Sequence, residues 1–169
     1  MKISSQLLML SIIFILLFNA CEKDDSSSSE RKTKPDIELN KELLLDLVNN
    51  ARTTGCDCGD TYFPPVNEVS WNNQLEEAAL THSKDMDDNN FFEHEGSDKS
   101  NAGERISKTG YIWTTWGENI AEGYSSEKAV IEAWIKSKSH CENIMQSDFT
   151  EMGVAKKGKY WTQVFAKPN

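Results

Sequence analysis

Three side chains in the sequence have the chemistry of a ligand-binding or proton-transfer site: His94, Glu118 and His140. Two neutral imidazoles and one carboxylate could bind a divalent cation such as Zn²⁺ and leave a coordination position open. A histidine and a glutamate could equally act as general acid and base, or form a satisfied polar network in a cavity. The three residues are 24 and 22 positions apart, so no local spacing rule brings them together.

No nucleophile relay accompanies these residues. Ser137 lies three positions before His140, but a serine near a histidine is common by chance, and the sequence has no Gly-x-Ser-x-Gly elbow. Cys141 follows His140 directly, yet a disulfide would consume its thiol. We therefore assign no catalytic residue, and the sequence favours a role other than catalysis.

The N-terminus has the pattern of an exported protein. Lys2 precedes an apolar run from Leu7 to Phe18, which is too short to span a bilayer comfortably. Leu17-Phe18-Asn19-Ala20-Cys21 resembles a relaxed lipobox, so residues 1–20 are predicted to be a lipoprotein signal peptide. Cys21 would then be the acylated first residue of the mature protein and its anchor in the membrane.

Residues 21–36 are predicted to be a flexible tether. They are charged and serine-rich and contain few apolar residues, so they cannot bury enough surface to fold. Lys23-Asp24-Asp25 resembles the surface-export signal of lipoproteins in the Bacteroidota. We expect an outer-membrane lipoprotein displayed on the cell surface.

The remaining residues, 37–169, have the usual size of one domain. The net charge of −9 and the lack of a basic stripe exclude a nucleic-acid partner, because phosphate binding needs clustered Lys and Arg.

Export changes the interpretation of the cysteines, because disulfides persist in oxidising compartments. Cys56 and Cys58 are too close to pair without strain, so Cys141 is expected to bond to one of them. Cys58–Cys141 is the favoured pairing and Cys56–Cys141 the alternative. Either bond would close a loop of about 80 residues and stabilise the domain by about 3–4 kcal/mol. The Cys-x-Cys pair could instead contribute to a metal site, although structural zinc sites usually use wider spacings.

The elements expected to position these residues are helices followed by a hairpin. Helices are predicted to begin at Asn40, Asn72 and Ser125 or Ser126, each with a capping side chain. The first ends at Gly55, the second has His82 on its buried face, and the third has Ser137 in line with Trp134, just before His140. Met152–Lys157 and Tyr160–Phe165 are predicted to form a hairpin around Gly158. The fold class is α+β.

Four blocks of the sequence resemble the signature blocks of one protein family: Phe91–His94, Gly117–Ala121, His140–Met145 and Tyr160–Phe165. They are similar to those of the CAP superfamily (cysteine-rich secretory, antigen 5 and pathogenesis-related proteins, with an SCP-like domain) in its short bacterial form. The resemblance covers about Leu39 to Phe165. It implies an α-β-α sandwich with a central antiparallel sheet flanked by helices.

The resemblance also implies that His94, Glu118 and His140 converge in a central cavity, where Glu118 orients an imidazole. Arg105 would anchor the backbone. Separately, because Trp113 and Trp116 lie just before Glu118 in the sequence, we expect them to line the cavity rim. Eukaryotic members carry a second glutamate at the position of Ser137, so the four-residue set is incomplete here.

These observations favour an exported, membrane-anchored binding module that holds a small apolar ligand, a lipid or sterol, or a partner protein. One alternative is a metal-assisted hydrolase or peptidase that uses His94, Glu118 and His140, with Zn²⁺ as the candidate cofactor. The other is an adhesion or envelope-structural protein. The sequence leaves the ligand and the oligomeric state open.

Overall fold

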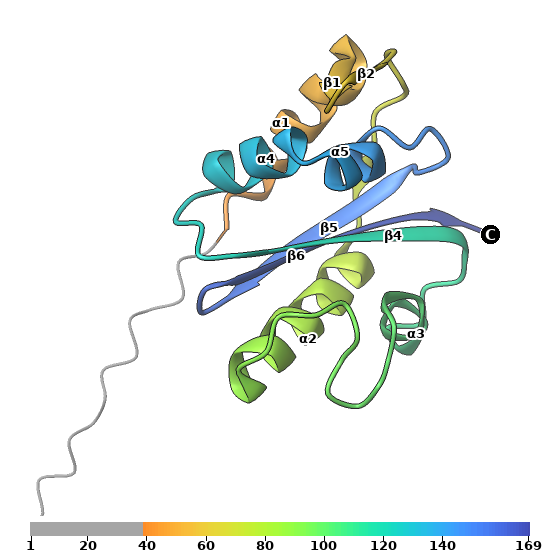
Figure 1. Ribbon diagram of the computed structural model, residues 1–169. Coiled ribbons are helices and arrows are strands. Elements are labelled where there is room, and N and C mark those ends of the chain that lie inside the picture. Colours follow the sequence, from red (N-terminus) through yellow and green to blue (C-terminus); the bar gives the residue numbers. More distant parts are fainter. Residues whose placement is uncertain (1–38) are drawn as a thin grey trace, which may run out of the picture. The chain divides into compact units, whose positions relative to one another are not determined.

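The computed structural model describes residues 39–169 (Figure 1). The predicted signal peptide, the acylated Cys21 and the tether lie outside the described residues. Within residues 39–169, no helix is both long enough and apolar enough to cross a membrane.

The described chain is α+β, as predicted, and the helices precede, interrupt and flank the strands. The helices are α1 (Lys41–Thr54), α2 (Asn73–Asn89), α3 (Ala102–Lys108), α4 (Glu127–Lys136) and α5 (Lys138–Ile144). The strands are β1 (Cys56–Cys58), β2 (Thr61–Phe63), β3 (Ser70–Trp71), β4 (Trp113–Glu122), β5 (Glu151–Lys157) and β6 (Tyr160–Pro168).

A four-stranded sheet with the order β3-β5-β6-β4 forms the middle of the domain. The predicted hairpin is present as β5 and β6, and β4 pairs antiparallel with the other edge of β6. The sheet departs from a purely antiparallel arrangement at β3, whose two residues run parallel to β5. The chain between β3 and β5 includes α2, α3, β4, α4 and α5. Parallel strands require a long connection of this kind, because a tight turn can join only antiparallel strands.

Helices cover both faces of this sheet (Figure 1). The helices α2 and α3 lie on one face, and α1, α4 and α5 lie on the other. The larger core cluster includes Leu44, Trp134 and Phe165, and a second one includes Leu75, Ile106 and Val164. The structure is thus the α-β-α sandwich that the sequence predicted.

The predicted caps explain where the first two helices begin. The Asn40 side chain accepts a hydrogen bond from the Leu43 amide at 2.9 Å, and Asn72 accepts one from Gln74 at 2.8 Å. The first helix ends at Gly55, whose φ of 76° is unfavourable for other residues.

The third predicted helix is broken at Ser137, and the prediction was wrong there. Ser137 has φ −90° and ψ 121°, so it ends α4 and begins α5 rather than continuing the helical face of Trp134. His140 consequently lies inside α5 instead of in a segment after the helix. Serine is common where helices begin, but Lys136-Ser137-Lys138 contains no Gly or Pro to indicate a break.

A small hairpin of β1 and β2 precedes the main sheet, and its first strand carries two cysteines. The structure places the disulfide between Cys58 and Cys141, which joins β1 to α5, and leaves Cys56 as a free thiol. This is the favoured of the two pairings that the sequence left open.

A buried arginine that the sequence did not single out ties α1 to the segment before β5. Arg52 is 0% exposed, and its guanidinium donates to the carbonyls of Ile144 at 2.6 Å, Phe149 at 3.0 Å, Asn67 at 2.7 Å and Gln146 at 3.0 Å. Burial lowers the pKa of Arg52 to about 10. The segment between α5 and β5 has few partners in the sheet, so these bonds satisfy its carbonyls.

Gly153 in β5 allows α2 to pack directly on the sheet, which yields a test of the fold. A Cβ at this position would lie 2.6 Å from the carbonyl carbon of Leu75 and would overlap the Glu76 amide nitrogen. We expect Gly153→Ala to lower the free energy of unfolding by about 3 kcal/mol, measured by urea denaturation, because backbone atoms cannot yield as a side chain does.

Gly123→Ala is the control for this substitution. It adds a methyl with nothing within 4 Å, although the φ of 87° is unfavourable, so its loss should be smaller, about 1–2 kcal/mol. If both substitutions lowered the free energy of unfolding equally, the close contact between α2 and Gly153 would not be the cause of the destabilisation.

Candidate functional site

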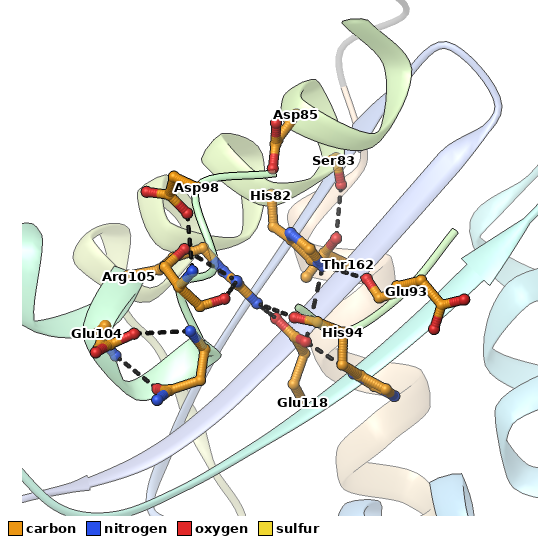
Figure 2. Close-up of polar contacts among 12 residues, drawn as sticks. His82, Ser83, Asp85, Glu93, His94, Asp98, Glu104, Arg105, Glu118 and Thr162 are labelled. Carbon is orange, nitrogen blue, oxygen red and sulfur yellow. Dashed lines mark hydrogen bonds and ion pairs between the residues drawn. The ribbon is translucent and has the colours of Figure 1, made fainter. Parts of the chain in front are cut away.

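The centre of the candidate site is the carboxylate of Glu118, near the middle of β4. Its side chain is only 3% exposed. Oε1 accepts a hydrogen bond from Nδ1 of His94 at 2.8 Å, and Oε2 accepts one from Nη2 of Arg105 at 2.7 Å (Figure 2). Each carboxylate oxygen therefore has a donor, although Glu118 is almost completely removed from water.

Glu118 is ionised at neutral pH despite its burial. Burial alone would raise the pKa of Glu118, but the hydrogen bond from His94 and the charge of Arg105 outweigh it, and the pKa lies below the usual range. The ionised carboxylate can only accept hydrogen bonds.

This charge state determines the tautomer of His94. Because Glu118 only accepts, Nδ1 of neutral His94 must carry the proton, and Nε2 keeps its lone pair. The His94 side chain is 59% exposed, so Nε2 is available to a ligand. The arrangement provides an oriented hydrogen-bond acceptor, base or metal ligand.

Arg105 holds both the carboxylate and the segment that carries His94. Its Nη1 donates to the Ser100 carbonyl at 2.8 Å, and its Nη2 donates to the His94 carbonyl at 3.0 Å. The short helix α3 that presents Arg105 begins with a reciprocal capping box between Asn101 and Glu104. The expected backbone-anchoring role of Arg105 is confirmed, whereas its ion pair with Glu118 was not foreseen.

His82 lies behind the carboxylate, on the buried face of α2. It is 0% exposed, and Nε2 lies 2.9 Å from the Glu93 carbonyl and 3.9 Å from Oε1 of Glu118. Burial lowers the pKa of His82, although the charge of Glu118 opposes the shift. Neutral His82 thus donates from Nε2 to the Glu93 carbonyl, next to His94, as expected for a hydrogen-bonded core histidine.

The loop between His94 and α3 has a further attachment to α2. The carboxylate of Asp85 accepts hydrogen bonds from the Ser97 amide at 2.8 Å and from the Ser97 hydroxyl at 2.6 Å. The loop is therefore held by α2 on one side and by Arg105 on the other, which fixes the backbone that carries His94.

An open cleft of about 540 Å³ lies in front of His94 and Glu118. Its other lining residues are Glu95, Lys99, Asn101, Ala102, Trp116, Gly117 and Asn143, with no serine, threonine or cysteine among them. Trp116 lines the cleft as expected. Trp113 instead packs behind it, and its indole N–H donates to the Ser107 hydroxyl at 3.0 Å.

His140 and Ser137 line a different groove of about 290 Å³, whose other lining residues are mostly apolar: Phe92, Ile120, Ala121, Glu122, Tyr124, Ala133 and Trp134. Burial lowers the pKa of His140, and the charge of His94 lowers it further, so the two histidines are electrostatic neighbours. The structure thus brings His94 and Glu118 into direct contact and places His140 beside a second groove.

The three candidate metal ligands do not form a closed set. Within residues 39–169, the only group of three His, Cys, Asp or Glu side chains with ligand atoms inside 4.8 Å of one another is Cys56, Cys58 and Cys141. His94, Glu118 and His140 are therefore not gathered as a set of three ligand atoms in this geometry.

A chain of amides connects the cleft to the interior. Asn143 of α5 donates to the Glu118 carbonyl at 3.1 Å and to Oδ1 of Asn119 at 2.9 Å. Asn119 then donates to Oε1 of Gln163 on β6 at 2.9 Å. Asn143 thus holds the backbone of β4 and also lines the cleft. Asn119 and Gln163 are buried polar residues that no sequence pattern set apart.

Comparison with known proteins identifies a family. The model of the cysteine-rich secretory protein family, CAP, matches residues 45–165. The chain is 30% identical over 139 residues to the uncharacterised membrane protein YlbC of Bacillus subtilis, a match covering 82% of this chain and 38% of that protein. It is also 36% identical over 93 residues to YkwD of the same organism, covering 54% of this chain and 36% of that protein. The chain thus spans well under half the length of these curated relatives.

Solved structures show the same fold. An extracellular protein with an SCP domain from Bacillus anthracis aligns with a TM-score of 0.65 at 30% identity, over 75% of this chain and 39% of that one. An outer surface protein of Borrelia burgdorferi aligns with a TM-score of 0.64 at 18% identity, over 76% of this chain and 92% of that one.

The ion pair between Arg105 and Glu118 predicts a strong stability effect. Arg105→Met would leave a buried, uncompensated carboxylate, so we expect the free energy of unfolding to fall by about 3–5 kcal/mol in urea denaturation. Adding Glu118→Leu should recover part of the loss, because both charges are then gone. Lys108→Met is the matched control on α3, since its pair with Asp98 is exposed. A double variant less stable than Arg105→Met would contradict the interpretation.

The buried histidine predicts the direction of the pH dependence. Because the pKa of His82 is lower in the folded protein than in the unfolded chain, the unfolded chain binds more protons as the pH falls through about 6.5. The free energy of unfolding should therefore decrease from pH 7 to pH 5, and the lowered pKa of Glu118 should add a further loss below about pH 4.5.

His82→Gln tests this assignment, since glutamine does not titrate. The variant should be less stable at pH 7, but its unfolding free energy should change less between pH 7 and pH 5 than that of the wild type. Thermal and urea unfolding at each pH would measure both. An unchanged slope would assign the acid sensitivity to other groups.

Proposed function

This chain belongs to the cysteine-rich secretory protein (CAP) family, and from that premise we propose that it is an exported, membrane-anchored binding module whose ligand occupies the His94 cleft. The observation that carries the proposal is the oriented imidazole. Glu118 holds Nδ1 of His94 at 2.8 Å and thereby presents Nε2 as an acceptor at the surface. Such a pre-oriented group binds a ligand donor at little entropic cost.

The cleft walls favour a segment of a partner protein over the other two ligand classes. Lys99, Asn101 and Asn143 provide donors and acceptors, and the Trp116 indole provides an apolar surface. An extended peptide offers both kinds of group at close spacing. A lipid chain would suit the apolar groove beside His140 better, at about 290 Å³.

The lining residues give less support to a hydrolase. The cleft lacks a hydroxyl or thiol nucleophile, and His140 lines the other groove. Catalysis through His94 and Glu118 would therefore need a water nucleophile activated by Nε2 alone, because Glu118 is already committed to His94 and Arg105.

The proposal includes export of the protein and its attachment to the membrane through Cys21. Support comes from the apolar run Leu7 to Phe18, which lies just before Cys21, and from the extracellular SCP-domain protein of Bacillus anthracis. An acyl chain on Cys21 and a tether to residue 36 would hold the binding domain outside the membrane. Capturing a partner protein there would also serve adhesion.

Selection from a displayed library of random heptapeptides on the purified protein would test the binding site. We expect enriched peptides to bind the wild type and to lose at least tenfold in affinity to His94→Ala and to Trp116→Ala, because these changes remove the acceptor and the apolar wall. Isothermal titration would measure each affinity. Glu77→Ala, on the exposed side of α2, is the control and should bind normally.

Two further arms separate the ligand classes. The affinity for a fluorescent fatty acid should also be measured with the same variants. We expect His94→Ala to leave that affinity unchanged. Peptides that bind His94→Ala as tightly as the wild type, or a fatty acid that requires His94, would contradict the assignment of the cleft to a protein segment.

A further inference from the structure

Three sulfur atoms meet at the junction of β1 and α5, away from the His94 cleft. Cys56 and Cys58 are two positions apart in a strand, so both side chains extend from the same side of β1 towards Cys141. Cys58 is bonded to Cys141. The free Cys56 thiol lies 3.4 Å from Sγ of Cys141 and 4.0 Å from Sγ of Cys58.

The three sulfurs differ in their access to solvent. Cys58 and Cys141 are both 0% exposed, whereas Cys56 is half-buried and is the free thiol among the described cysteines. Any base or reagent must therefore reach the cluster through Cys56. A separation of 3.4 Å is within the range of reacting atoms, about 3–3.5 Å. The three sulfur separations place Cys56 at roughly a right angle to the Cys58–Cys141 bond, so the Cys56 side chain must rotate into line with that bond before it attacks.

We propose that Cys56, Cys58 and Cys141 form a thiol–disulfide exchange site, in which Cys141 is the shared partner of the other two. The Cys56 thiol releases its proton to solvent, and the thiolate attacks Sγ of Cys141. A Cys56–Cys141 bond forms while the Cys58–Cys141 bond breaks, and Cys58 leaves as a thiolate that takes up a proton. The new bond uses an electron pair of the Cys56 thiolate, and the electron pair of the broken bond leaves with Cys58. Cys56 is oxidised as Cys58 is reduced, so the step needs no external oxidant.

The structure holds the Cys58–Cys141 bond, and burial slows its exchange. Cys58 must leave as a thiolate at a position closed to solvent, where the charged form is disfavoured. Burial and the charge of Asp57 also raise the pKa of Cys56, so the attacking thiolate is scarce at neutral pH. The exchange is therefore slow at pH 7 and accelerates in mild alkali.

Asp57 makes the two bonding patterns distinguishable, because an endoprotease that cuts before aspartate separates Cys56 from Cys58. The full chain, carrying Cys21→Ser so that three cysteines remain, would be held at pH 8.5. It would then be acidified, unfolded in urea and alkylated with N-ethylmaleimide. Mass spectrometry of the digest reads which thiol was free. We expect most label on Cys56 and a reproducible minor fraction, above about 1%, on Cys58.

Variants and dilution complete the test. Oxidised Cys58→Ser should form the Cys56–Cys141 bond quantitatively, while Cys56→Ser should keep Cys58–Cys141 and take up no label. Tenfold dilution of the wild type should leave the labelled fraction of Cys58 unchanged, because the exchange is intramolecular. Label confined to Cys56 at pH 8.5, two free thiols in Cys58→Ser, or a fraction that falls on dilution would each overturn the proposal.

Discussion

The burial of one carboxylate, that of Glu118, is the constraint around which the site is built. An ionised group with 3% exposure is tolerable only if its charge is compensated and both oxygens accept hydrogen bonds. Arg105 meets the first requirement, and Arg105 and His94 together meet the second. The orientation of the imidazole and the course of the loop that carries it both follow from this single electrostatic need.

Arginine has a second structural use on the opposite side of the sheet. Within residues 39–169, Arg52 has no carboxylate partner. Its guanidinium instead binds four backbone carbonyls, three of them at or just after the end of α5. Arg105 likewise binds the carbonyls of His94 and Ser100. In both places an irregular segment would otherwise bury unpaired carbonyls, and the planar fork of donors satisfies several at once. These bonds fasten the loops that flank the sheet.

Local signals made much of the fold predictable. Asn40 and Asn72 are capping residues before apolar periodic runs, and Gly158 separates two alternating segments, so those helices and that hairpin could be predicted from the sequence. The break at Ser137 and the two-residue strand β3 could not, because tertiary contacts determine them and no residue there has a strong preference of its own.

The site was predictable only in part, for a related reason. The resemblance of the sequence blocks indicated His94 and Glu118, and the structure shows their contact. The pairing of Arg105 with Glu118 depends on the angle between α3 and β4, and the position of His140 depends on the short helix α5. Neither the pairing of Arg105 with Glu118 nor the position of His140 could be predicted from the periodicity of the sequence. Among the described residues, Arg52 is likewise apparent only from the carbonyls that surround it.

The place of β6 in the sheet has a consequence for how the protein is made. This strand follows all other strands of the described residues, yet it lies between β5 and β4 and is the sole partner of β4. While a ribosome is still adding residues before Tyr160, β4 has no neighbour to pair with, so the emerging chain cannot close its hydrophobic layers. Folding is thus deferred until synthesis of the domain is nearly finished. A chain kept open in this way remains competent for threading through a translocation pore.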